Sequence, residues 1–141
     1  MNNWQSNFLD KLNKVQTQWV RSFESTMDRF IMAAFEDVAS FVRDNGFKVS
    51  TPLQDDGRRS FKFELSENAY LLMIFRFSGV GEFELRCESF TPGGEPTLSK
   101  SMMRLADVDE EWAGKQFQSA LDSFLEAMAG SRFQQAEALS V

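Results

Sequence analysis

The side chains most often used in catalysis are scarce in this sequence. The 141-residue chain contains no His and a single Cys, Cys87. Without imidazole it lacks the commonest general base and nitrogen metal ligand, so catalysis would have to rest on carboxylates, Lys, Tyr or the thiol. Cys87 alternates with Phe83 and Leu85 along a predicted strand, and a buried Cys behaves as a small apolar residue. We therefore expect no catalytic residues and a protein that is not an enzyme, with a carboxylate-based enzyme as the remaining alternative.

The acidic residues and glycines do not form a typical metal or cofactor motif. Asp107, Asp109, Glu110 and Glu111 lack the alternating ligand spacing and central Gly of a calcium loop. Acidic residues in a first helical turn instead complement the helix dipole. The Gly79-Val80-Gly81 segment lies between two predicted strands, whereas nucleotide-binding glycine motifs join a strand to a helix. We expect neither a metal nor a cofactor.

The charge and cysteine content indicate a cytoplasmic protein. A net charge of −6 argues against nucleic-acid binding, which requires Lys and Arg to neutralise phosphates. The only adjacent basic pair, Arg58-Arg59, lies near Asp55 and Asp56, as in a solvated turn. A single Cys permits no intrachain disulfide and favours a reducing compartment. No stretch approaches the roughly 18 uninterrupted apolar residues of a membrane span, so we expect no membrane partner.

The N-terminal part of the chain has the apolar period of a long amphipathic helix over residues 4–44. Many of its apolar residues also repeat at intervals of eleven, which is typical of a nearly straight helix. The helix is either continuous or broken near residues 22–26, where Ser25 and Asp28 could form a cap. Asn45-Gly46 predicts its end. The apolar row is Trp4, Phe8, Leu12, Val15, Trp19, Phe23, Met27, Phe30, Ala34, Val38 and Phe41.

After Gly46 the apolar period changes to two, which predicts an antiparallel meander of four strands over residues 47–91. Residues 97–103 could add a fifth strand. Asp107 and Glu110 fit a capping box for an amphipathic helix over residues 107–129 that ends near Gly130. Residues 131–141 are then a C-terminal tail. The predicted fold class is α+β, with residues 1–130 forming a single domain.

One predicted strand is apolar on both faces. Leu71, Met73, Phe75 and Phe77 lie on one side, and a stripe of Tyr70, Leu72 and Ile74 lies on the other, between charged rows. Exposed apolar stripes usually mark contact surfaces. Three coverings are open: the N-terminal half of the long helix folded back over the stripe, a second copy or another protein, or a small ligand.

These features favour a non-enzymatic module for protein binding or self-association, adaptor-like or chaperone-like, with a homodimer as one form. Its predicted partner-binding residues come from the long helix and the central strand. They are Trp4, Phe8, Leu12, Trp19, Tyr70, Leu72 and Ile74. The alternative is a binder of a small apolar or amphipathic ligand between sheet and helices. Its cavity would be lined by Met73, Phe75, Phe124 and Met128.

Overall fold

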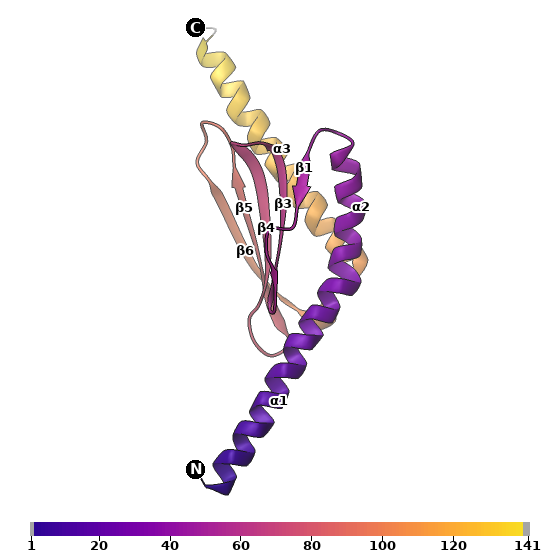
Figure 1. Ribbon diagram of the computed structural model, residues 1–141. Coiled ribbons are helices and arrows are strands. Elements are labelled where there is room, and N and C mark those ends of the chain that lie inside the picture. Colours follow the sequence, from indigo (N-terminus) through magenta and orange to yellow (C-terminus); the bar gives the residue numbers. More distant parts are fainter. Residues whose placement is uncertain (1, 140–141) are drawn as a thin grey trace.

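The computed structural model describes residues 2–139, and the side chains of residues 2–130. It confirms the predicted α+β class: an N-terminal helical segment, an antiparallel sheet and a C-terminal helix (Figure 1). The helical elements are α1 (Asn3–Thr26), the π-helical turn η1 (Met27–Ile31), α2 (Met32–Arg43), the 3-10 turn η2 (Leu105–Asp107) and α3 (Glu110–Leu139). The strands are β1 (Lys48–Ser50), β2 (Gln54–Asp55), β3 (Arg58–Ser66), β4 (Ala69–Phe77), β5 (Glu82–Phe90) and β6 (Thr97–Arg104).

The N-terminal helical segment is continuous from α1 through η1 to α2, so the alternative of a break near residues 22–26 is wrong. The distortion comes just afterwards, as the π-helical turn. Thr26 Oγ1 donates a hydrogen bond to the Ser22 carbonyl at 2.8 Å, an arrangement that often bends helices. Kinks also occur at π-helical turns, and Figure 1 shows α1 and α2 meeting at an angle. Gly46, with φ of 96°, lies in the turn after α2, at the predicted end of the segment.

The sheet has the strand order β1-β3-β4-β5-β6, with the short β2 also paired to β3. Every pairing is antiparallel, and β6 is the fifth strand expected over residues 97–103. Ile74 pairs with Ser60 on one side and Arg86 on the other. In the strands other than β2, this register places the even-numbered residues on one face and the odd-numbered residues on the opposite face. In β2 the order is reversed, so Asp55 lies beside Arg58 on the even-numbered face.

The helices cover only the odd-numbered face of the sheet. Phe61 and Phe75 on that face are fully buried, and the ring of Phe117 on α3 lies 5.4 and 6.0 Å from their ring centroids. Phe35 on α2 also contacts Phe117, at 5.9 Å between centroids. Rings at these separations gain more than their buried area alone provides. The core is therefore a layer of aromatic side chains between the sheet and the helices.

The beginning and end of α3 differ from the prediction. Asp109, not Asp107, is its cap, because the Asp109 carboxylate accepts a hydrogen bond from the Trp112 N–H at 2.7 Å. Asp107 instead pairs with Arg104 at 3.0 Å. The helix continues past Gly130 to Leu139, through most of the predicted C-terminal tail. Residues 140–141 of that tail lie outside the described residues.

Candidate interaction surfaces

The first half of α1 is an exposed helix with an apolar row. Residues 2–18 are all exposed, yet the helix has a complete capping box between Asn2 and Gln5 at its beginning. Trp4 is 70% exposed and stacks on Phe8 at 5.4 Å between ring centroids. Leu12 and Val15 continue the row and are also exposed. We call Trp4, Phe8, Leu12 and Val15 the α1 stripe.

The apolar row passes from solvent into the core at Trp19. This residue is half-buried, and a β-carbon built on Gly81 would lie 3.4 Å from its ring. Phe23, the next member of the row, is fully buried and lies 6.0 Å from Phe77 between ring centroids. Val80, next to Gly81, is 64% exposed. The row therefore leads directly to an apolar site at the β4–β5 turn.

The prediction that the N-terminal helix could fold back over Tyr70, Leu72 and Ile74 is wrong. Figure 1 shows α1 projecting beyond the end of the sheet, away from its strands. The odd-numbered face of the sheet buries Phe23 and Met27 from the second half of α1 and from η1. Because the segment is one continuous helix, its first half cannot turn back to the opposite face.

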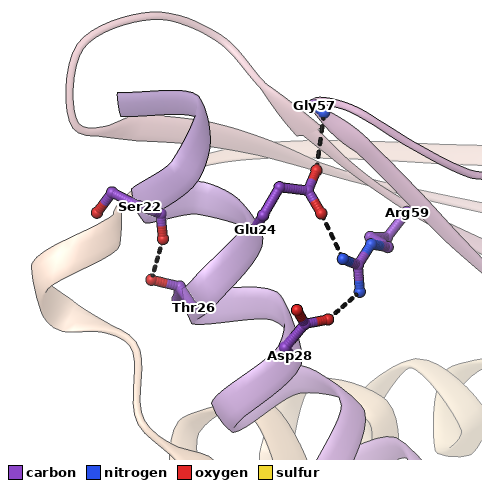
Figure 2. A network of polar contacts seen from close by, with 6 residues as sticks. All are labelled: Ser22, Glu24, Thr26, Asp28, Gly57 and Arg59. Carbon is purple, nitrogen blue, oxygen red and sulfur yellow. Dashed lines mark hydrogen bonds and ion pairs between the residues drawn. The ribbon is translucent and has the colours of Figure 1, made fainter. Parts of the chain in front are cut away.

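An ion-pair network around the buried Arg59 side chain, which we call the Arg59 clamp, fixes α1 and η1 to the sheet (Figure 2). Arg59 on β3 donates to carboxylate oxygens of Glu24 and Asp28, the latter at 2.8 Å. The second Glu24 oxygen accepts the Gly57 N–H at 2.9 Å. Burial lowers the pKa of Arg59, but hydrogen bonds and charge from Asp28 and Glu24 outweigh it and raise the pKa above its usual value. Only Arg58, paired with Asp55 at 3.1 Å, matches the predicted solvated turn.

The predicted stripe of Tyr70, Leu72 and Ile74 lies on the even-numbered face of the sheet, which we call the open face. These side chains are half-buried by neighbours on the same face. The Phe90 ring stacks on Tyr70 at 4.6 Å between centroids, and Lys62 Nζ lies 4.5 Å above the Tyr70 ring. Among residues 2–130, no helix buries this face in the way that Phe23 and Phe117 bury the other.

Leu98 and Met102 on β6 extend the apolar part of the open face, and the sequence analysis missed both. They are 53% and 52% exposed and lie opposite Glu88 and Glu84 on β5. The available signal in the sequence was that both are apolar residues at even-numbered positions of the same predicted strand. It could be assigned to a face only once the β5–β6 register was known.

Basic residues are concentrated on the open face. Seven Lys and Arg share it with five Asp and Glu, whereas the remaining eight Lys and Arg of the sequence are set against sixteen Asp and Glu. The open face thus has the opposite net charge to the rest of the chain. The net charge of −6 for the whole chain does not reveal this difference. The basic residues are Lys48, Arg58, Lys62, Arg76, Arg86, Lys100 and Arg104, and the acidic ones Asp55, Glu64, Glu82, Glu84 and Glu88.

A groove of about 400 Å³ lies between α3 and strands β5 and β6. Its lining includes the apolar Leu71, Leu85 and Phe124, together with hydroxyl side chains. Of the four residues predicted to line a ligand cavity, only Phe124 does so. Met73 and Phe75 are fully buried in the core, and Met128 is half-buried outside the groove lining. The hydroxyl side chains are Ser89, Thr97, Ser99, Ser101, Ser119 and Ser123.

Cys87 also lines this groove. Burial raises the pKa of its thiol, and hydrogen bonding to Ser99 opposes that shift without cancelling it. A raised pKa keeps the thiol protonated at neutral pH, and the protonated form is a poor nucleophile. This environment agrees with the predicted role of Cys87 as a packing residue.

Comparison of the chain with family models, curated proteins and solved structures found no match. Among residues 2–139, no helix has the length and apolar character to cross a membrane. Within the same described part of the chain, no three His, Cys, Asp or Glu side chains are grouped as metal ligands.

Proposed function

We propose that this chain is a non-enzymatic, cytoplasmic interaction module that self-associates through the α1 stripe. The observation that supports the proposal is a row of four exposed apolar side chains on a helix half without packing partners among the described residues. Most of the stability of a helix in a protein comes from tertiary packing of its apolar face, which this half lacks. A partner that covers this row would both remove apolar surface from water and stabilise the helix.

The strength of such an interface follows from the side chains in it. Fully burying a large apolar side chain contributes roughly 1.5–3 kcal/mol. The α1 stripe already packs in part against its own helix, so each member would contribute only a fraction of that. The two stripes together supply enough burial free energy to offset the entropy lost on association and on ordering the side chains. We expect a moderate affinity rather than a permanent complex.

Size-exclusion chromatography with light scattering of the full chain tests the proposal over a range of concentrations. The variant Phe8→Gln/Leu12→Gln is expected to remain monomeric where the parent associates, with an unchanged circular dichroism signature of the sheet. The matched control is Asn13→Gln/Thr17→Gln, which changes two exposed residues on the opposite side of α1. A parent chain that is monomeric at every concentration would overturn the proposal.

The open face adds a second surface to this module. Its apolar residues Tyr70, Leu72, Ile74, Leu98 and Met102, mixed with an excess of basic side chains, suit a polypeptide partner with apolar and acidic residues. The interspersed Glu residues make it a poor match for a phosphate backbone. We include this face in the proposed module as the binding surface for a different protein.

The groove beside α3 supports a second candidate function, the binding of a small amphipathic ligand. Its apolar lining and hydroxyl groups could hold the two ends of such a molecule, and its volume falls within the usual range of ligand sites. Mass spectrometry of the natively purified protein is expected to reveal a co-purified compound that Phe124→Ala releases. Protein that carries no such compound, and whose stability does not respond to added fatty acid, would exclude this function.

A further inference from the structure

We infer that two copies pair through their α1 stripes in antiparallel orientation, and that Trp4 of each copy packs against Trp19 and Val80 of the other. This inference rests on the proposed self-association and adds its geometry. Three features of the chain support it: the helix face that the stripe occupies, the spacing of the apolar row, and the apolar site at the β4–β5 turn.

The first feature is that one helix face serves both the stripe and the core. Past Trp19, the row continues with Phe23 and Met27, which are fully buried against the chain's own sheet. A parallel partner helix would run along this face into the space that the sheet occupies. An antiparallel partner would instead end at Trp19, and its own sheet would lie beyond Asn3. Antiparallel pairing therefore covers both stripes without a collision between the two sheets.

The second feature is the near-symmetry of the row about its centre. Trp4 and Trp19 lie equally far from the midpoint, as do Phe8 and Val15, and Leu12 lies next to the midpoint. An antiparallel pair thus places Trp4 opposite Trp19, Phe8 opposite Val15, and the two Leu12 side chains near the two-fold axis. A two-fold interface must be self-complementary, and this arrangement satisfies that condition with one small residue opposite each Phe.

The third feature is a receiving site at the place where the partner helix would begin. Val80 is 64% exposed, and Gly81 has no side chain to cover the half-buried ring of Trp19. The opposing Trp4 is itself 70% exposed. With the exposed parts of both stripes and both Val80 side chains, the pair would remove on the order of 1,000 Å² from water, about the minimum for a specific interface.

The charges beside the row give this arrangement a distinctive salt dependence. Lys11 lies seven residues after Trp4 and four before Val15, so it flanks the row close to its midpoint. Antiparallel pairing brings the two Lys11 side chains near each other across the axis. Salt screens such repulsion, so the dimer is expected to strengthen, not weaken, as ionic strength rises.

Distances between spin labels in the full-length dimer test the orientation. Single Cys residues at Asn3 or Asn13, on a Cys87→Ser background, place labels on the polar side of α1. In an antiparallel pair the Asn3 labels are offset by about 26 Å along the helix axis and the Asn13 labels by only about 4.5 Å. The Asn3 distance is then expected to exceed the Asn13 distance by on the order of 10 Å. Equal distances at the two positions would overturn the inference.

Val80→Asp tests the receiving site, and Leu98→Asp is its control. Both side chains are exposed, but Leu98 lies on the open face, away from the proposed interface. We expect Val80→Asp to weaken association at least tenfold and Leu98→Asp to leave it unchanged, with both variants melting like the parent. Equal affinities for the two would overturn the proposed role of Val80. Self-association as such is decided separately by the α1 stripe variant, so a failure here is distinguishable from a failure of the proposed function.

Discussion

Replacing Arg59 is expected to destabilise the fold, because its guanidinium is buried between Glu24 and β3. Breaking a buried ion pair costs about 3–5 kcal/mol. Since Asp28 is largely exposed and Glu24 partly so, we expect a smaller loss of about 2 kcal/mol for Arg59→Gln. Urea denaturation measures the change.

The neighbouring Arg58 provides the control for this prediction. Its pair with Asp55 is exposed, and such pairs contribute roughly 0–1 kcal/mol. Arg58→Gln should therefore leave the free energy of unfolding almost unchanged. Equal destabilisation by the two substitutions would mean that the Arg59 clamp does not hold α1 to the sheet.

The Cys87 thiol is expected to react slowly with alkylating reagents in the folded protein. Its raised pKa means that the thiolate forms only at a more alkaline pH than in an exposed cysteine. The reaction rate of the folded protein should therefore begin to rise at a higher pH than the rate of the unfolded chain. Iodoacetamide labelling followed by mass spectrometry, with and without urea, measures both rates. Equal rates at neutral pH would contradict the half-buried position of the thiol.

At the scale of the elements, α1 is expected to have two halves of different stability. Residues 3–18 have no core contacts, whereas Phe23, Met27 and Ile31 are fully buried. Hydrogen exchange in the first half should therefore be fast in dilute protein and slow at concentrations where the chain associates. Exchange over residues 27–43 should not depend on concentration. Fast exchange of residues 3–18 in the associated form would show that α1 is not the interface.

The elements themselves could largely be predicted from the sequence, because period and turn residues are local signals. The change of period after Gly46 marked the strands, and Tyr70, Leu72 and Ile74 were correctly separated from Met73 and Phe75. The π-helical turn at residues 27–31 had no such local signal, since neither Gly nor Pro marks it.

The position of the surfaces depended on contacts between distant residues, which the sequence did not reveal. Arg59 was grouped with Arg58 and Asp55, its sequence neighbours, although its partners Glu24 and Asp28 lie on α1 and η1. The direction in which α1 leaves the sheet could not be predicted for the same reason, because the packing of Phe23 against the sheet determines it. A pattern shows that Trp4 and Phe8 form an apolar row, but only the tertiary structure shows that this row is exposed.

At the scale of the whole molecule, charge is divided between the open face and the remainder of the chain. We expect the protein to bind polyglutamate more strongly than its net charge of −6 suggests, because the open face is basic. Arg76→Glu/Lys100→Glu should weaken this binding, as measured by fluorescence anisotropy at low salt. Arg43→Glu/Lys115→Glu, which reverses two exposed charges on α2 and α3, is the matched control. Equal losses in both variants would mean that the open face has no special role.

The shape of the dimer follows from where α1 leaves the sheet. In the antiparallel arrangement about 24 Å of paired helix separates the two sheets, since residues 3–18 rise about 1.5 Å each. Small-angle X-ray scattering is then expected to give a distance distribution with a second maximum, from two lobes at opposite ends of a helical pair. The Phe8→Gln/Leu12→Gln variant, as a monomer, should lose that maximum and its longest distances.

A single-peaked distribution for the dimer would mean that the two sheets lie close together. A different surface, such as the open face, would then have to form the interface. Two separated lobes would instead leave both open faces uncovered, so that one self-associated module could hold two copies of an acidic partner.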